Sequence, residues 1–164
     1  MTGKRIVIDA GVWNHWHNVI GEDTSSFEVI ENYIQSKNDE ILCLDEDGII
    51  MKQCGRNTSG DFYRVYKMCY DRIDMVSSEM PGDIIDELKT KLGFHEDSDI
   101  CYVGVAMNSD KIIITLDGDF GIYPDEYYRS LKDANAKHAV ANYMKNELKL
   151  RVFTSEMYLD EESV

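Results

Sequence analysis

Residues 111–120 read KIIITLDGDF, the most strand-like stretch of the chain, and it runs directly into two aspartates. Three consecutive isoleucines are typical of a short strand buried on both faces of a parallel sheet. Asp117 and Asp119 stand just beyond the carboxyl end of this strand. The stretch therefore predicts a buried strand that delivers carboxylates to one edge of a sheet.

The first residues of the chain have the same arrangement. Residues 5–9 read RIVID, so that a second apolar run ends in an acid, Asp9. Residues 40–44 (EILCL) and residues 151–153 (RVF) are expected to form two further strands. Short apolar strands that alternate with helices indicate a mainly parallel sheet covered on both faces, which is a three-layer α/β/α fold.

Helical spacing of apolar residues fills most of the chain between these strands. The middle third of the chain is expected to be wholly helical, and the acidic tail from Asp160 is expected to fray. The expected helices run to Ile34 from the cap candidates Ser25 and Ser26, over residues 49–54, along the stripe from Phe62 to Cys69, from Pro81 to Gly93, from Asp97 or Ser98 through Met107, and in one or two segments of residues 124–150.

Length and composition predict a single domain over residues 1–164, with no internal repeat and no linker. Four scattered cysteines without a C-x-x-C pair are expected in the core. No signal-peptide core and no run of 18 apolar residues is present, so we expect a cytoplasmic protein without membrane contact. The formal net charge of −14 counts against a simple electrostatic binder of nucleic acid, which would carry a basic face.

Aspartates at adjacent strand ends carry the chemical prediction. In open parallel sheets the functional crevice lies beyond the carboxyl ends of the strands, where Asp9, Asp117 and Asp119 are expected. Asp99, in the first turn of a helix, can join them. Crowded carboxylates repel one another unless a hard cation such as Mg²⁺ or Mn²⁺ binds them. Such a site predicts metal-assisted hydrolysis of a phosphodiester bond.

The order of these motifs resembles the PIN-domain nuclease family across essentially the whole chain. IVIDAGVW, residues 6–13, is similar to the first motif of the family, with Asp9 at the strand end. Residues 97–120, DSDICYVGVAMNSDKIIITLDGDF, are similar to its C-terminal motifs, and RVFTSEMYL, residues 151–159, to its last strand and small helix. The matching positions are Asp9, Asp99, Ala106, Thr115, Asp117, Asp119 and Phe120.

The resemblance implies a PIN-like fold and a metal-dependent endonuclease that acts on RNA in preference to DNA. It implies that Asp9, Asp99 and Asp117 hold Mg²⁺ or Mn²⁺, and that Asp119 is a further ligand or orients the attacking water. A toxin, a defence effector and an RNA-processing enzyme all fit this reading. A protein partner and self-association stay open.

Two other functions are kept as alternatives. The family usually carries a further acid, often glutamate, where Gln53 stands in LDEDGIIMKQCGRN, residues 44–57, unless Glu46 or Glu40 replaces it. The chain can therefore be a catalytically degenerate PIN-like interaction subunit with an acidic surface. Asp9 can also be a phosphoryl acceptor, although DAGVW lacks the second aspartate of haloacid-dehalogenase-like phosphatases.

Aromatic and histidine residues outside the aspartates are given structural roles. Trp13 and Trp16 follow the first strand and can stack on bases, but aromatic residues at this helical spacing are more often in a core. His95 and His138 lack a partner at a recognisable ligand spacing. We therefore expect these four side chains to serve the core or the surface.

Overall fold

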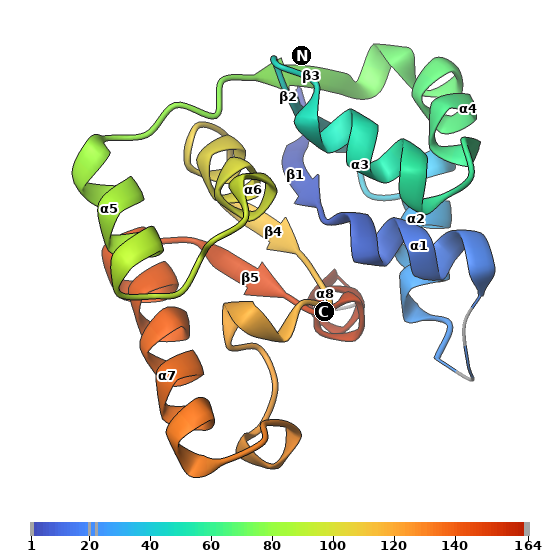
Figure 1. Cartoon of the computed structure of the whole chain (residues 1–164). Coiled ribbons are helices and arrows are strands. Elements are labelled where there is room, and N and C mark those ends of the chain that lie inside the picture. The colour runs from blue at the N-terminus through green and yellow to red at the C-terminus, as the bar shows by residue number, and fades with distance from the viewer. Residues whose placement is uncertain (1, 20, 22, 163–164) are drawn as a thin grey trace.

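Parallel strands form the centre of the computed structural model, which describes residues 2–19, 21 and 23–162 (Figure 1). Within these residues the sheet has five strands in the spatial order β3-β2-β1-β4-β5, and every neighbouring pair is parallel. The expected three-layer α/β/α fold is therefore confirmed. The strands are β1 (Lys4–Ile8), β2 (Glu40–Asp45), β3 (Ile73–Val76), β4 (Ile112–Ile114) and β5 (Arg151–Phe153).

Helices cover both faces of the sheet. Figure 1 shows α1 to α4 gathered on one side of the molecule and α5 to α7 on the other. Short 3-10 turns and one π-helical turn, Tyr143–Glu147, complete the chain. The helices are α1 (Ala10–Asn18), α2 (Ser25–Ile34), α3 (Ile49–Asn57), α4 (Asp61–Met68), α5 (Gly82–Thr90), α6 (Asp97–Met107), α7 (Leu131–Asn142) and α8 (Ser155–Glu162).

The strand order reverses beside β1. From β1 the chain adds β2 and then β3 on one side, and it later returns to add β4 and β5 on the other side. Val7 pairs with Ile113 and Ile8 with Ile114, so β1 and β4 end next to each other. Right-handed crossovers that run in opposite directions place their helices on opposite faces. A crevice therefore opens where β1 and β4 end.

The central strands are buried because both of their faces are covered. Val7, Ile113 and Ile114 are completely buried, as the runs RIVID and KIIIT predicted. Each such aliphatic side chain contributes about 1.5–3 kcal/mol through the removal of its surface from water. All four cysteines are buried and free, as expected. Packing of the core thus fixes the positions of the carboxyl ends of β1 and β4.

The prediction of a wholly helical middle third was wrong, because β3 lies within it. β3 pairs with β2 from Ile73 opposite Leu42 to Val76 opposite Asp45. Its sequence, IDMV, buries only the two ends, Ile73 and Val76. An edge strand of four residues leaves too few apolar positions for a recognisable pattern. The pairing with β2 decides this conformation.

Helix ends differ from the predicted caps by a few residues. Ser25 and Ser26 do not cap α2 but lie inside it, where the Ser26 hydroxyl hydrogen-bonds the Ser155 hydroxyl at 2.7 Å. Glu96, rather than Asp97 or Ser98, precedes the first residue of α6. α5 ends at Thr90, before the expected stop at Gly93. Boundaries of this kind depend on local hydrogen bonds that a sequence pattern does not specify.

The C-terminal segment is helical to Glu162, so the expected fraying from Asp160 was wrong within the described residues. The Tyr158 hydroxyl of α8 donates a hydrogen bond to the buried carboxylate of Glu40, at the start of β2. Lys4 of β1 forms an ion pair with Glu162. These contacts hold α8 against the amino-terminal ends of two strands. No helix among residues 2–19, 21 and 23–162 is long and apolar enough to cross a membrane.

We predict that Gly104→Ala destabilises the protein by about 1–3 kcal/mol, because α6 lies close to the segment after β3. A Cβ atom at Gly104 would lie 2.1 Å from the backbone oxygen of Ser78. This overlap outweighs the gain of about 1 kcal/mol from the higher helix propensity of alanine. Urea unfolding measures the change. Gly82→Ala at the start of α5 is the control, since no atom lies within 4 Å of the added methyl group, and equal stability of the two variants would contradict the prediction.

Candidate metal centre

The crevice between the ends of β1 and β4 holds the predicted aspartates. Asp9 directly follows β1, and its backbone N–H donates to the carbonyl oxygen of Ile114 at 2.9 Å. Asp117 follows β4 by three residues. The two strand ends are therefore joined by backbone pairing up to the first acid. This placement is the one that the sequence predicted.

The buried hydroxyl of Thr115 connects the acids of the two strands. It donates to the Asp9 carboxylate at 2.7 Å and accepts the backbone N–H of Asp117 at 3.0 Å. The Asp117 carboxylate in turn accepts the backbone N–H of Asp119 at 2.9 Å. These bonds fix the loop after β4 so that both of its carboxylates stay near the strand ends. The orientation of the acids is thus set by the fold.

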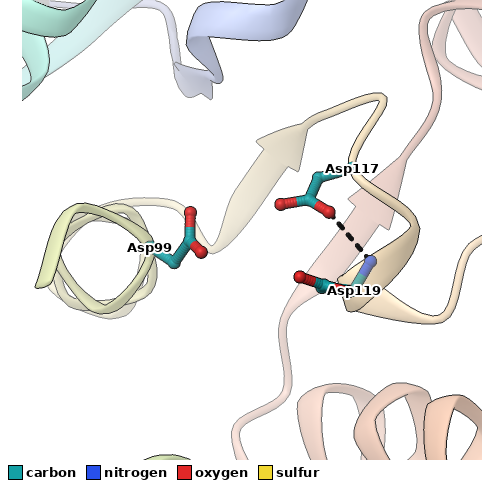
Figure 2. A group of neighbouring side chains, drawn as sticks. All are labelled: Asp99, Asp117 and Asp119. Carbon is teal, nitrogen blue, oxygen red and sulfur yellow. Dashed lines mark hydrogen bonds between the residues drawn. The ribbon is translucent and has the colours of Figure 1, made fainter. Parts of the chain in front are cut away.

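Three carboxylates converge in this crevice. Figure 2 shows Asp99 extending from α6 toward Asp117 and Asp119, which come from the loop after β4. Each of these residues offers one carboxylate oxygen, and these oxygens all lie within 4.8 Å of one another. Asp99 reaches them because α6 packs across β1, β2 and β4. Residues from two distant segments of the chain therefore form one acidic cluster.

Burial and mutual repulsion perturb the carboxyl groups of the cluster. Burial, with the charges of Asp117, Asp9 and Asp119 added, raises the pKa of Asp99 to about 7. Burial also raises the pKa of Asp117, although the hydrogen bond from the Asp119 amide opposes this rise. Such crowding disfavours the charged forms of these carboxyl groups unless a cation lies close to them. Asp99 takes up a proton near neutral pH when no other cation is supplied.

Asp9 does not belong to the group of carboxylates that lie within 4.8 Å of one another. Burial raises its pKa, the hydrogen bond from Thr115 opposes the rise, and the charge of Asp117 adds to it. Its charge also acts on Asp99. Asp9 is therefore a buried acid that is coupled electrostatically to the cluster, although its carboxylate is not one of the three that converge.

Gln53 lies beside the cluster on α3, as its place in the sequence suggested. The Tyr102 hydroxyl donates to Gln53 Oε1 at 2.6 Å and accepts the backbone N–H of Ala10 at 3.1 Å. Gln53 Nε2 is 3.4 Å from the hydroxyl oxygen of Ser98, the neighbour of Asp99. A neutral amide thus occupies the junction of α1, α3 and α6, next to Asp9.

The donor set fits a hard divalent cation. Carboxylate oxygens are the ligands that Mg²⁺ and Mn²⁺ prefer, and three of them converge here with raised pKa values on two. Lys137 of α7 supplies part of the missing positive charge, since its ammonium lies 3.1 Å from the Asp119 carboxylate. One ammonium contacts a single member of the cluster. Burial raises the pKa of Asp117 by more than Lys137 lowers it, and every main influence on the pKa of Asp99 raises it.

Other predicted and missed residues lie outside the cluster. Trp13 is completely buried and meets Phe62 edge to face, which confirms its place in the core. His138 hydrogen-bonds Asp125 on the surface. Sequence reasoning missed Lys137 and a group of tyrosines beside Asp119. The three tyrosines of YPDEYYR, residues 123–129, were the signal that could have revealed the aromatic group, whereas nothing in the local sequence marked Lys137.

No known protein family, no curated protein and no solved structure matches this chain. The geometry of the acidic crevice is therefore the basis of the functional argument.

We predict that the metal-free protein loses stability as the pH rises from about 4 to about 7. The pKa of Asp99 is raised to about 7 in the folded state, above the ordinary value of 3.8, so the folded state holds an extra proton in this range. Asp99→Asn removes part of this loss and stabilises the protein at pH 8 by about 1–2 kcal/mol, a discounted value because the side chain keeps some solvent contact. Urea unfolding in a chelator between pH 5 and pH 8 measures the effect.

Asp97→Asn is the matched control for Asp99→Asn. Asp97 lies one half-turn away in the same first turn of α6, and its side chain is 87% exposed. The Asp97→Asn substitution should leave the dependence of stability on pH unchanged. An identical pH dependence in the parent and in Asp99→Asn would show that the cluster does not perturb Asp99.

Proposed function

We propose that this chain is a PIN-like, metal-dependent endonuclease that hydrolyses phosphodiester bonds in RNA. The observation that carries the proposal is the convergence of Asp99, Asp117 and Asp119 at the point where the strand order reverses. A phosphodiester is a polyanion, and a negatively charged crevice receives it only with a cation in place. A single divalent cation would therefore reduce both the repulsion among the carboxylates and the repulsion between the carboxylates and the substrate.

Asp99, Asp117 and Asp119 would hold Mg²⁺ or Mn²⁺, and the buried Asp9 would act on them electrostatically. A divalent ion held there would polarise a phosphoryl oxygen and ease the ionisation of a water molecule near neutral pH. Asp119 is the most exposed of the three acids and is suited to orient that water through its carboxylate. The hydroxyl of Thr115 holds the Asp9 carboxylate and the backbone of Asp117 in fixed positions relative to each other.

The second candidate function is a degenerate PIN-like interaction subunit. Gln53 favours it, because a neutral amide stands at the junction of α1, α3 and α6. An acid at this position would add a fifth carboxylate to the four predicted aspartates. The net charge of −14 also suits a basic protein partner. The two functions differ in a single measurable property, which is cleavage of RNA in the presence of a divalent ion.

We predict cleavage of labelled single-stranded RNA in Mn²⁺ or Mg²⁺ and none in EDTA, with weaker cleavage of DNA. Asp99→Asn should weaken Mn²⁺ binding by about tenfold or more and reduce cleavage by about 100-fold or more, since it removes a charged ligand. Isothermal titration calorimetry measures Mn²⁺ affinity and gel assays measure cleavage. Asp97→Asn, purified in parallel, should match the parent in both and so exclude a contaminating nuclease.

Different failures of this experiment have different meanings. Tight Mn²⁺ binding without cleavage would leave the metal centre intact and favour the interaction subunit. Absence of Mn²⁺ binding would refute the metal centre itself, whatever the cleavage assay shows. Cleavage that is equal in the parent and in Asp99→Asn would show that the activity does not arise in this crevice.

We predict that Gln53→Glu strengthens Mn²⁺ binding by about tenfold, because it adds a carboxylate beside Asp9 without a change of size. A glutamate oxygen can still accept the Tyr102 O–H, and the Ser98 hydroxyl can donate to the other oxygen, so the local contacts are retained. Calorimetry at pH 7.5 measures the affinity. If the parent is inactive and Gln53→Glu cleaves RNA, the parent is a degenerate member of this fold; an affinity equal to that of the parent would show that Gln53 lies outside the reach of the ion.

A further inference from the structure

A groove of about 570 Å³ opens directly beside the acidic cluster. Residues 117–119 line one side of it, and residues 127–130 with Asp133 and Lys137 of α7 form the rest. Figure 1 shows this loop descending from β4 and turning into the lower end of α7. Its volume lies within the range of about 300–1,000 Å³ that is typical of small-molecule sites. The groove is thus a space of ligand size that is continuous with two of the proposed metal ligands.

Tyr127 forms an aromatic platform in this groove. Its ring stacks on Tyr123 with a centroid distance of 4.2 Å and an interplanar angle of 23°, and the edge contact with Tyr128 has a centroid distance of 5.2 Å. The hydroxyls of Tyr123 and Tyr128 donate to the carbonyl oxygens of Leu116 and Gly118, at 2.8 and 2.9 Å. Tyr123 and Tyr128 are therefore anchored on the loop after β4, which carries two of the proposed metal ligands. Tyr127 is left 59% exposed.

Gly118 permits the close approach of this platform to the cluster. A Cβ atom at Gly118 would lie 2.9 Å from Cε1 of Tyr127, which is closer than real Cβ contacts allow. Gly118 stands between Asp117 and Asp119 in the sequence. The exposed ring of Tyr127 consequently lies against the backbone of the residues that present the carboxylates.

Two basic side chains line this groove of an otherwise acidic protein. Arg129 and Lys137 line it, against the carboxylates of Asp117, Asp119 and Asp133. The groove is therefore slightly negative by itself, and the neighbouring carboxylates of Asp99 and Asp9 add to this charge. A divalent ion at the cluster would offset two of these negative charges, so the groove should accept a phosphate group more readily when the metal centre is loaded.

We propose that this groove is the subsite for an unpaired nucleotide of the RNA substrate, adjacent to the phosphodiester at the metal centre. The base stacks on Tyr127, and Arg129 and Lys137 face the neighbouring phosphate groups. This inference rests on the proposed function, which it deepens by assigning a nucleotide subsite to Tyr127, Arg129 and Lys137 of this chain. Stacking on a protein ring requires a base that has left its own helix, so a paired duplex cannot use this platform.

The experiment measures binding of a fluorescent, phosphorothioate-linked single-stranded RNA, which resists cleavage with Mg²⁺, by anisotropy in Mg²⁺. Tyr127→Ala should weaken binding by about tenfold, as expected for the loss of one base stack. Tyr127→Phe keeps the ring and should restore binding to within about twofold of the parent. A fully paired hairpin RNA should bind at least tenfold more weakly than the single strand, and EDTA should weaken binding of both.

Tyr70→Ala is the matched control, because Tyr70 is also an exposed tyrosine, and it precedes the edge strand β3, away from the carboxyl ends of β1 and β4 where the cluster lies. It should bind the single strand as the parent does. Equal affinities of Tyr127→Ala and Tyr70→Ala would overturn the subsite, and so would preference for the hairpin. Mn²⁺ affinity, measured on the same variants, should not change. Intact Mn²⁺ binding with RNA binding that does not depend on Tyr127 refutes the subsite alone, whereas loss of Mn²⁺ binding in the parent refutes the metal centre.

Discussion

The hydroxyl of Thr115 joins the carboxyl ends of β1 and β4, because it donates to Asp9 and accepts the N–H of Asp117. The side chain is completely buried, so this donor and acceptor are paired where water cannot replace them. The rest of the crevice depends on this bond. It holds the Asp9 carboxylate at the end of β1. It also orients the loop after β4 so that Asp117 and Asp119 face α6. A strand end without this hydroxyl would leave the loop free to move its carboxylates apart.

Electrostatic strain is the consequence of this arrangement. Asp99, Asp117 and Asp119 are brought together by packing of α6 on the sheet and by the hydrogen-bonded loop after β4, although their charges repel. The apolar core stabilises the fold by an amount that can offset this repulsion. In the proposed metal centre, a bound divalent ion would relieve this repulsion. Stability, protonation and the proposed metal binding would then be linked through the same three side chains.

Aromatic anchoring extends this rigid crevice toward a substrate. Tyr123 and Tyr128 bind the backbone of the loop after β4 through their hydroxyls, and in doing so they hold Tyr127 beside the cluster. Lys137 links α7 to Asp119 and completes the connection. The groove and the metal centre thus share one structural support. Gln53, on the other side of the cluster, is held just as firmly by Tyr102, so its neutral amide is a defined feature of the site.

Local sequence indicated the buried strands and the acids that follow them, because short runs of β-branched residues are typical of strands buried on both faces of a parallel sheet. RIVID and KIIITLDGDF therefore predicted the two strand ends with Asp9, Asp117 and Asp119, whereas Asp99 was placed by its position in the first turn of a helix. The tertiary structure decided β3, whose four residues become a strand only through pairing with β2. It also decided that Asp9 stays outside the group of three converging acids and that Tyr127 reaches the cluster across Gly118. These outcomes depend on distances between segments that are far apart in the chain, and the spacing of residues along a sequence does not contain them.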